Sequence, residues 1–241
     1  MIINFKKLLL YILFSCFIFN TSFAKCMEGD CKNGTGTLLR FDNSNYTGQF
    51  KDKKYHGQGI YIWSDNAKYK GKFIKGLRNG KGFFEITNGI KFEGEFKDDQ
   101  YLNGIFTFPN DDVYAGEFKD GKFHGEGIYT YINGEKYIGQ FIAGRRNGKG
   151  VFEYADGNRY SGEFKDGKFH GQGVFTSIGG EKYIGQFIES KRTGKGIFTY
   201  RNGDVYSGEF KDGKFHGQGV FTSIGGEKYI GQFIEGKRAI N

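Results

Sequence analysis

The side chains best suited to chemistry recur at regular intervals along this chain. Glu117, Glu163 and Glu209 occupy equivalent positions of a recurring pattern, and the chain has only four histidines, which share another position of it. Histidines can bind zinc or act as general bases, and paired carboxylates can hydrolyse glycosidic bonds. The histidines are His56, His124, His170 and His216.

The spacing argues against both kinds of chemistry. If each half of the 46-residue interval forms two strands, equivalent residues lie four strands or about 19 Å apart. Ligands of one zinc ion lie about 2 Å from it, so copies of one position cannot share a metal. Phosphate-loop, nucleophile-elbow and kinase motifs are missing, and Gly57-Gln58-Gly59 lacks a third glycine. We therefore expect no catalytic residue, metal, cofactor or small-molecule substrate, and no enzyme.

A perfect internal repeat organises the sequence. Tyr160 to Glu189 and Tyr206 to Glu235 are identical, and each 46-residue copy contains two related halves. Such periods are typical of arrays in which stacked units supply one another's core. The 23-residue units begin at Tyr46, Tyr69, Phe92, Tyr114, Tyr137, Tyr160, Tyr183, Tyr206 and Tyr229, and only the Phe92 unit is one residue short.

Each unit predicts two strands. In the unit at Tyr160, strands are expected over 160–165 and 170–177, with a tight turn at Asp166-Gly167-Lys168. Side chains alternate between the faces of a strand, so rings are expected to cover the glycines of the neighbouring strand. The positions assigned to this shared face are Tyr160, Gly162, Phe164, Gly171, Gly173 and Phe175, and in the identical copy Tyr206, Gly208, Phe210, Gly217 and Gly219.

The frame Tyr-x-Gly-Glu-Phe-x-x-Gly-x-x-x-Gly-x-Gly, clear from Tyr114 to Gly127, resembles the MORN repeat. The resemblance runs from about residue 26 to 241. It implies a binding module, in a family often associated with phosphoinositide or membrane binding. Two units depart from the frame, with Asp99 and Leu102 in one and Ser190 in the other replacing glycines, and we expect those hairpins to be weakened.

Composition agrees with an all-β fold. The chain holds 41 glycines, 16 tyrosines, 27 phenylalanines and one proline, which suits neither a helical nor a disordered protein. We expect an elongated antiparallel β-meander of 23-residue hairpins in a single twisted and curved sheet, with a groove on its aromatic face. The predicted organisation is a signal peptide over 1–24, a partial N-terminal repeat or cap over 25–45, and an array of eight units plus a truncated ninth over 46–241.

The start of the chain, over 1–24, differs from the array. Lys6 and Lys7 precede an apolar run over 8–19, and Ser22-Phe23-Ala24 is a small-x-small cleavage signal. This pattern predicts a cleavable signal helix and an exported chain, whether periplasmic, cell-surface or secreted. An uncleaved anchor is the alternative, although the run is shorter than the roughly 20 residues that span a membrane. Lipidation at Cys16 is a third reading.

Cleavage would leave two cysteines, Cys26 and Cys31. An even pair in an exported chain predicts a disulfide, which would pin the partial first repeat. Two free thiols in a loop are the alternative.

Every second hairpin tip carries cations without an adjacent acid in the sequence. A row of such tips could contact an anionic membrane surface, whereas solvated turns that keep the sheet soluble are the simpler interpretation. The candidate contacts are Arg78, Arg145, Arg146, Lys191, Arg192, Lys237 and Arg238.

We therefore carry two functional hypotheses. The first is a non-enzymatic exported scaffold that binds another protein or itself, with end-to-end pairing through its last strand. The alternative is peripheral binding to an anionic membrane surface through the basic tips. Export argues against nucleic acid as a partner, and glycan binding along the aromatic groove is a third, weaker possibility.

Overall fold

The computed structural model of the protein describes residues 24–239. The predicted signal helix lies outside the described residues, apart from Ala24 at its end. Across residues 24–239 the chain forms antiparallel β-strands joined by turns and contains no helix. The all-β prediction is therefore confirmed. Since this part holds no helix, it also holds none that is long and apolar enough to cross a membrane.

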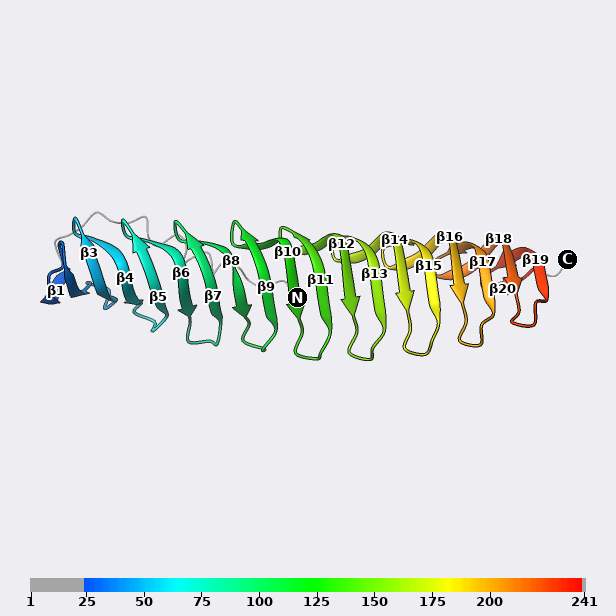
Figure 1. Cartoon of the computed structure of the whole chain (residues 1–241), viewed down its shortest axis with the longest axis horizontal. Helices are drawn as coiled ribbons and strands as arrows, with labels where there is room; N and C mark the ends of the chain where they lie inside the picture. Colours follow the sequence, from blue (N-terminus) through cyan, green and yellow to red (C-terminus); the bar gives the residue numbers. More distant parts are fainter. Residues whose placement is uncertain (1–23, 240–241) are drawn as a thin grey trace. The chain divides into compact units, whose positions relative to one another are not determined.

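The chain divides into two compact units, the first ending at Gly125 and the second beginning at Glu126. In the first unit consecutive strands pair in an antiparallel meander (Figure 1). Its strands are β1 (Lys25–Gly29), β2 (Thr35–Leu39), β3 (Asn45–Lys51), β4 (Lys54–Ile62), β5 (Lys68–Ile74), β6 (Leu77–Glu85), β7 (Lys91–Lys97), β8 (Gln100–Thr107) and β9 (Val113–Lys119), and β10 (Lys122–Thr130) contains the boundary.

The second unit repeats the same meander, again with each strand paired to the next. Its strands are β11 (Lys136–Ile142), β12 (Arg145–Glu153), β13 (Arg159–Lys165), β14 (Lys168–Thr176), β15 (Lys182–Ile188), β16 (Lys191–Thr199), β17 (Val205–Lys211), β18 (Lys214–Thr222), β19 (Lys228–Ile234) and β20 (Lys237–Arg238).

Two-residue turns join the strands within a repeat. Between β13 and β14 the turn is Asp166-Gly167, with φ of 50° and 86°. Two successive residues at positive φ match the right-handed twist of a hairpin, and Asp and Gly tolerate that conformation well. The predicted turn was one residue too long, because Lys168 already pairs with Lys165.

A bulge follows the turn in most repeats and corrects one prediction about the glycines. Gly162 pairs with Gly173 and Glu163 with His170, so Gly171 and Gln172 have no partner on β13. Gly171 has φ +55°, and a Cβ there would meet the Glu163 carboxylate at 2.5 Å. Gly171 therefore does not share the face of Gly173, because the bulge interrupts the alternation that the prediction assumed.

Tyrosine rings pack on the paired glycines, on the face of the sheet opposite to that of Gly171. A Cβ on Gly173 would lie 2.5 Å from the Tyr160 hydroxyl oxygen, and a Cβ on Gly162 would lie 2.6 Å from it. The Tyr160 side chain itself is fully buried. Only glycine leaves room for the ring, so the glycine pair and the tyrosine form one packing unit in each repeat.

The tyrosine hydroxyl also donates a hydrogen bond to a backbone carbonyl at the bulge. Tyr160 Oη donates to the Glu163 carbonyl at 2.9 Å and lies 3.3 Å from the His170 carbonyl. The same bond to the residue three positions on recurs at 2.8–3.4 Å for Tyr46, Tyr69, Tyr114, Tyr137, Tyr183, Tyr206 and Tyr229. In the repeats that begin with tyrosine, the phenolic hydroxyl thus gives a hydrogen bond to a backbone carbonyl at the bulge.

The short repeat at Phe92 follows the same logic. Between β7 and β8 only Leu102 lacks a partner, because Glu95 pairs with Asn103 and Phe96 with Tyr101. The missing residue therefore shortens the bulge from two residues to one. Phenylalanine stands here in place of the tyrosine whose hydroxyl serves the longer bulge elsewhere.

At the start of the first unit, Cys26 and Cys31 are joined by a disulfide, with their Cα atoms 6.0 Å apart. Cys26 lies on β1, and Cys31 lies in the turn that leads to β2.

Candidate functional site

One position of the repeat holds either an aromatic ring or an arginine, and the two alternate except at Tyr101 and Phe123, which are consecutive rings. It lies nine positions after the first tyrosine of most units, at the start of the second strand of each hairpin. We call this position the slot. Its occupants are Tyr55, Arg78, Tyr101, Phe123, Arg146, Phe169, Arg192, Phe215 and Arg238.

An aromatic slot residue packs on the preceding tyrosine or phenylalanine. Phe169 stacks on Tyr160 with centroids 3.8 Å apart, and Phe215 stacks on Tyr206 at 3.9 Å. An arginine slot residue places its guanidinium against the equivalent rings. Arg192 Cζ lies 5.6 Å from the centroid of Tyr183, the equivalent of Tyr160, and 5.1 Å from that of Phe198, both within the usual range of a cation–π contact.

This arrangement corrects the prediction of a row of free basic tips. The Cζ atoms of Arg78, Arg146, Arg192 and Arg238 each lie 4.7–5.7 Å from the centroids of at least two rings on the aromatic face. The sequence reading missed this because adjacent cations alternate between the two faces of a strand. An alignment of the copies would have revealed it, because arginine and phenylalanine share one column.

The cations at the tips themselves face carboxylates of the next hairpin. Arg145 pairs with Asp166 at 3.3 Å and Lys191 with Asp212 at 3.2 Å. The alternate hairpins add Lys168 with Glu189 and Lys214 with Glu235. All of these side chains are more than half exposed, so water screens the attraction within each pair. They nevertheless balance the charge of most tips in the second unit.

In the Arg78 slot, the guanidinium is paired with a carboxylate of the same chain. Asp99 Oδ1 accepts hydrogen bonds from Arg78 Nε and from the Arg78 backbone N–H, both at 2.9 Å. The two side chains are only 4% and 6% exposed. The residue that replaces a turn glycine thus also neutralises a buried arginine, and the weakening of its hairpin stays a prediction.

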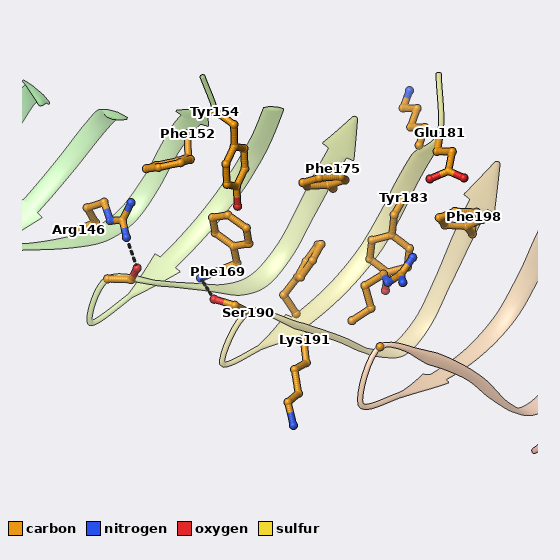
Figure 2. Close-up of a pocket in the computed structure, with 15 residues that line it drawn as sticks. Arg146, Phe152, Tyr154, Phe169, Phe175, Glu181, Tyr183, Ser190, Lys191 and Phe198 are labelled. Carbon is orange, nitrogen blue, oxygen red and sulfur yellow. Dashed lines mark hydrogen bonds between the residues drawn. The ribbon is translucent and has the colours of Figure 1, made fainter. Parts of the chain in front are cut away.

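A groove of about 590 Å³ opens on the aromatic face of the second unit. Phe169, Phe175 and Phe198 line it and are partly exposed, and the two slot arginines Arg146 and Arg192 both reach it. Figure 2 shows the rings gathered on one side of the strands, whereas Lys191 points away from them. The groove is therefore chiefly apolar with two guanidinium groups, which is the usual composition of a peptide-binding surface.

The opposite face of the second unit carries an aliphatic band. Ile184 pairs with Ile197 across β15 and β16, and both are 43% exposed. Lys195 lies opposite Glu209 in the next strand pair. These residues line a shallower groove of about 560 Å³. Among the residues that the structure describes, no aromatic ring lines this second groove.

The repeated histidines and glutamates remain separate copies. Glu163 accepts a hydrogen bond from the Gln172 backbone N–H at 3.0 Å, so its carboxylate closes the bulge. Within residues 24–239, no three His, Cys, Asp or Glu side chains are grouped to hold a metal. Burial raises the pKa of Tyr183 and of Tyr101 to about 12, so these phenols stay protonated at neutral pH.

The geometry agrees with the comparisons to known proteins. The MORN repeat model matches seven segments, at 46–68, 69–91, 114–136, 137–159, 160–182, 183–205 and 206–228. None of the curated protein sequences compared matches the chain.

Among solved structures, the TCP10 domain of CPAP from Danio rerio is 12% identical with a TM-score of 0.42, over 83% of this chain and 90% of that one. The TCP domain of SAS-4 from Drosophila melanogaster, in complex with a proline-rich motif of Ana2, is 11% identical with a TM-score of 0.36, over 72% and 83%. Both TM-scores lie below 0.5.

The matched segments cover more than half of the sequence, and they begin at the first ring of seven of the repeats described above. MORN repeats are non-catalytic interaction scaffolds, and this chain belongs to the MORN-repeat family.

Proposed function

We propose that this protein is a non-enzymatic exported scaffold that binds a segment of another protein in the aromatic groove of its second unit. The observation that carries the proposal is the groove itself. Phe169, Phe175 and Phe198 remain partly exposed there, although rings of the same type are buried elsewhere in the array. Exposed rings in a concave surface are where binding energy concentrates in protein interfaces.

A membrane surface is the less favoured ligand. The hypothesis rested on unopposed tip cations, but Arg145 and Lys191 have carboxylate neighbours and Arg146 and Arg192 face the rings. A row of paired charges attracts an anionic surface weakly, because each added carboxylate cancels the attraction of one cation.

Two neighbouring residues on β16 provide a matched test. Phe198 faces the groove, whereas Ile197 lies on the opposite face of the same strand. We expect Phe198→Ser to weaken capture of the partner by roughly tenfold or more, and Ile197→Ser to leave it unchanged. The partner is first captured from the envelope of the exporting cell on the mature chain and identified by mass spectrometry, and its affinity for each variant is then measured.

The two variants also separate the faces as binding surfaces. If only Ile197→Ser weakened binding, the aliphatic band would be the interface and the proposal would be wrong. Circular dichroism of both variants checks that the array still folds.

Export is part of the proposal and rests on the sequence over 1–24. N-terminal sequencing of the protein recovered outside the cytoplasm should begin at Lys25. Recovery of a chain that begins at Met1, or only from the cytoplasm, would contradict export. Self-association also stays a prediction, and light scattering of the mature chain at several concentrations tests it.

A further inference from the structure

Three arginine slots share one backbone frame. In each, the backbone N–H of the second turn residue of the next hairpin donates to the arginine carbonyl. The distances are 3.0 Å from Asp99 to Arg78, 2.9 Å from Gly167 to Arg146, and 3.0 Å from Gly213 to Arg192. The turn residue therefore lies at the same place in all three slots. The slots differ only in the side chain that this residue carries.

Only the first of these slots contains a carboxylate. Asp99 Oδ1 accepts from both Nε and the backbone N–H of Arg78, while Arg78 Nη2 donates to the Asp99 carbonyl at 3.1 Å. Arg146 adopts the same pose, because its Nη2 donates to the Gly167 carbonyl at 2.7 Å. Glycine, however, offers no side-chain acceptor to the remaining donors.

Arg192 is the more open of the two glycine-flanked slots. Across residues 24–239, no hydrogen bond or ion pair joins its guanidinium to another residue. Burial lowers its pKa, which reflects a charge that has lost water without gaining a carboxylate. Glu181 attracts it from the rim of the groove but lies outside ion-pair distance.

From this comparison we infer that Arg146 and Arg192 are two carboxylate-binding subsites of the aromatic groove, filled by acidic side chains of an extended peptide segment. The inference rests on the proposed function and adds the chemistry of the partner. Asp99 shows within the same chain how a carboxylate oxygen meets both donors of a slot arginine.

The two subsites lie in one groove at a defined separation. Arg146 on β12 and Arg192 on β16 are four strands apart, which is about 19 Å along the sheet. An extended chain advances about 3.3 Å per residue, so acidic residues six positions apart span about 20 Å. The partly exposed rings of Phe169 and Phe175 come from β14, between β12 and β16, and favour an apolar residue at the middle of the segment.

The test uses the full mature chain and three fluorescein-labelled peptides of equal length. The first has two glutamates six positions apart with phenylalanine midway. The second has glutamines in their place, and the third has the same composition with the glutamates three positions apart. We expect the first to bind roughly tenfold or more tightly than the other two, because each charge-assisted hydrogen bond is strong in a partly buried groove.

The decisive variants introduce an aspartate of the chain itself beside each slot arginine. In Gly213→Asp and Gly167→Asp the new side chain copies Asp99, which itself adopts φ 67°, and should fill the slots of Arg192 and Arg146. A Cβ at either glycine meets no atom within 4 Å. We expect each variant to weaken the first peptide to about the affinity of the glutamine peptide, in line with the loss of a charged hydrogen bond. Gly236→Asp is the matched control, because it adds the same charge beside a slot that holds Phe215.

The results of the peptide test can be told apart from a failure of the proposed function. Equal binding of the three peptides, or no binding of any, overturns the carboxylate inference, whereas the partner capture described above still tests the groove through Phe198. Binding to phosphatidylglycerol vesicles that Gly213→Asp reduces and Gly236→Asp does not would also overturn it, because the slots would then take lipid phosphate. If Gly236→Asp weakened the peptide as much as Gly213→Asp, general charge repulsion would explain the loss and the inference would fail.

Discussion

The ring of Phe169 lies nearly parallel to the ring of Tyr160, with centroids 3.8 Å apart and an angle of 8° between the planes. In the next repeat Arg192 occupies the equivalent slot, with Cζ 5.6 Å from the Tyr183 centroid. A planar guanidinium thus replaces a ring in the same slot. The exchange keeps the packing of the array and brings a charge into the groove.

Replacing this arginine with the aromatic residue of the alternate slots should therefore be tolerated. We expect Arg192→Phe to preserve the free energy of unfolding within about 1 kcal/mol, because a ring fills the slot and a partly desolvated charge is removed. Arg192→Ala should lower it by about 2 kcal/mol, since the stem and the guanidinium both pack on rings. Urea unfolding followed by circular dichroism compares the two. Equal losses would show that the slot does not accept a ring.

The tyrosine hydroxyl should stabilise only the repeats with a two-residue bulge. Tyr160→Phe leaves the Glu163 carbonyl without its 2.9 Å hydrogen bond, and we expect a loss of about 1 kcal/mol in the free energy of unfolding. Phe92→Tyr is the control, because the bulge in that repeat is one residue shorter. It should give no gain. A stabilised Phe92→Tyr protein would refute the link between hydroxyl and bulge length.

The paired glycines should tolerate no side chain. A Cβ on Gly173 would lie 2.5 Å from the Tyr160 hydroxyl oxygen and 2.6–2.7 Å from two of its ring carbons. We expect Gly173→Ala to cost about 3 kcal/mol, because the ring or the strand must move. In Gly225→Ala the added Cβ meets only Ser223 Oγ at 3.7 Å, so that change should lie within about 0.5 kcal/mol. Similar costs for the two would contradict ring-on-glycine packing.

Removing the carboxylate of the buried ion pair should lower the free energy of unfolding. Replacing the arginine with an aromatic residue as well should restore it. Asp99→Gly leaves the charge of Arg78 buried without its carboxylate, and we expect a loss of about 3 kcal/mol. The double variant Arg78→Tyr with Asp99→Gly recreates the Tyr55 and Gly76 combination and should recover most of it. Asp212→Asn, at an exposed pair, should cost less than about 1 kcal/mol. A double variant as unstable as the single one would show that the slot is not interchangeable.

Alkaline pH should destabilise the array. Burial raises the pKa of Tyr183 to about 12, whereas an unfolded tyrosine ionises near pH 10. Between these values the native state binds more protons than the unfolded state, so stability is intact below about pH 10 and falls as the pH rises towards 12. Urea midpoints between pH 9 and 11 should fall less steeply for Tyr183→Phe than for the wild type. Parallel slopes would contradict a raised pKa at this residue.

The sequence predicted the repeat and its packing but not the groove chemistry. The period, the turns and the rings over glycine follow from local rules, because Tyr160, Gly162 and Phe164 alternate on one strand. The face on which Gly171 lies could not be predicted in the same way. A bulge shifts the alternation of side chains between the two faces, and no residue type in the sequence marks the bulge. The pairing of Arg78 with Asp99 was missed for a related reason. It joins two consecutive hairpins across 21 residues, and only the strand register brings the two side chains together.

Arginine side-chain resonances test the central claim most directly. In the full mature chain, the Nε–Hε signals of Arg146 and Arg192 are followed by nuclear magnetic resonance while the peptide with glutamates six positions apart is added. Our account predicts that these two signals shift and saturate together, and that the signal of the exposed Arg145 at the hairpin tip does not. A shift at Arg145 with Arg146 and Arg192 unchanged would contradict it and would place binding at the tips instead.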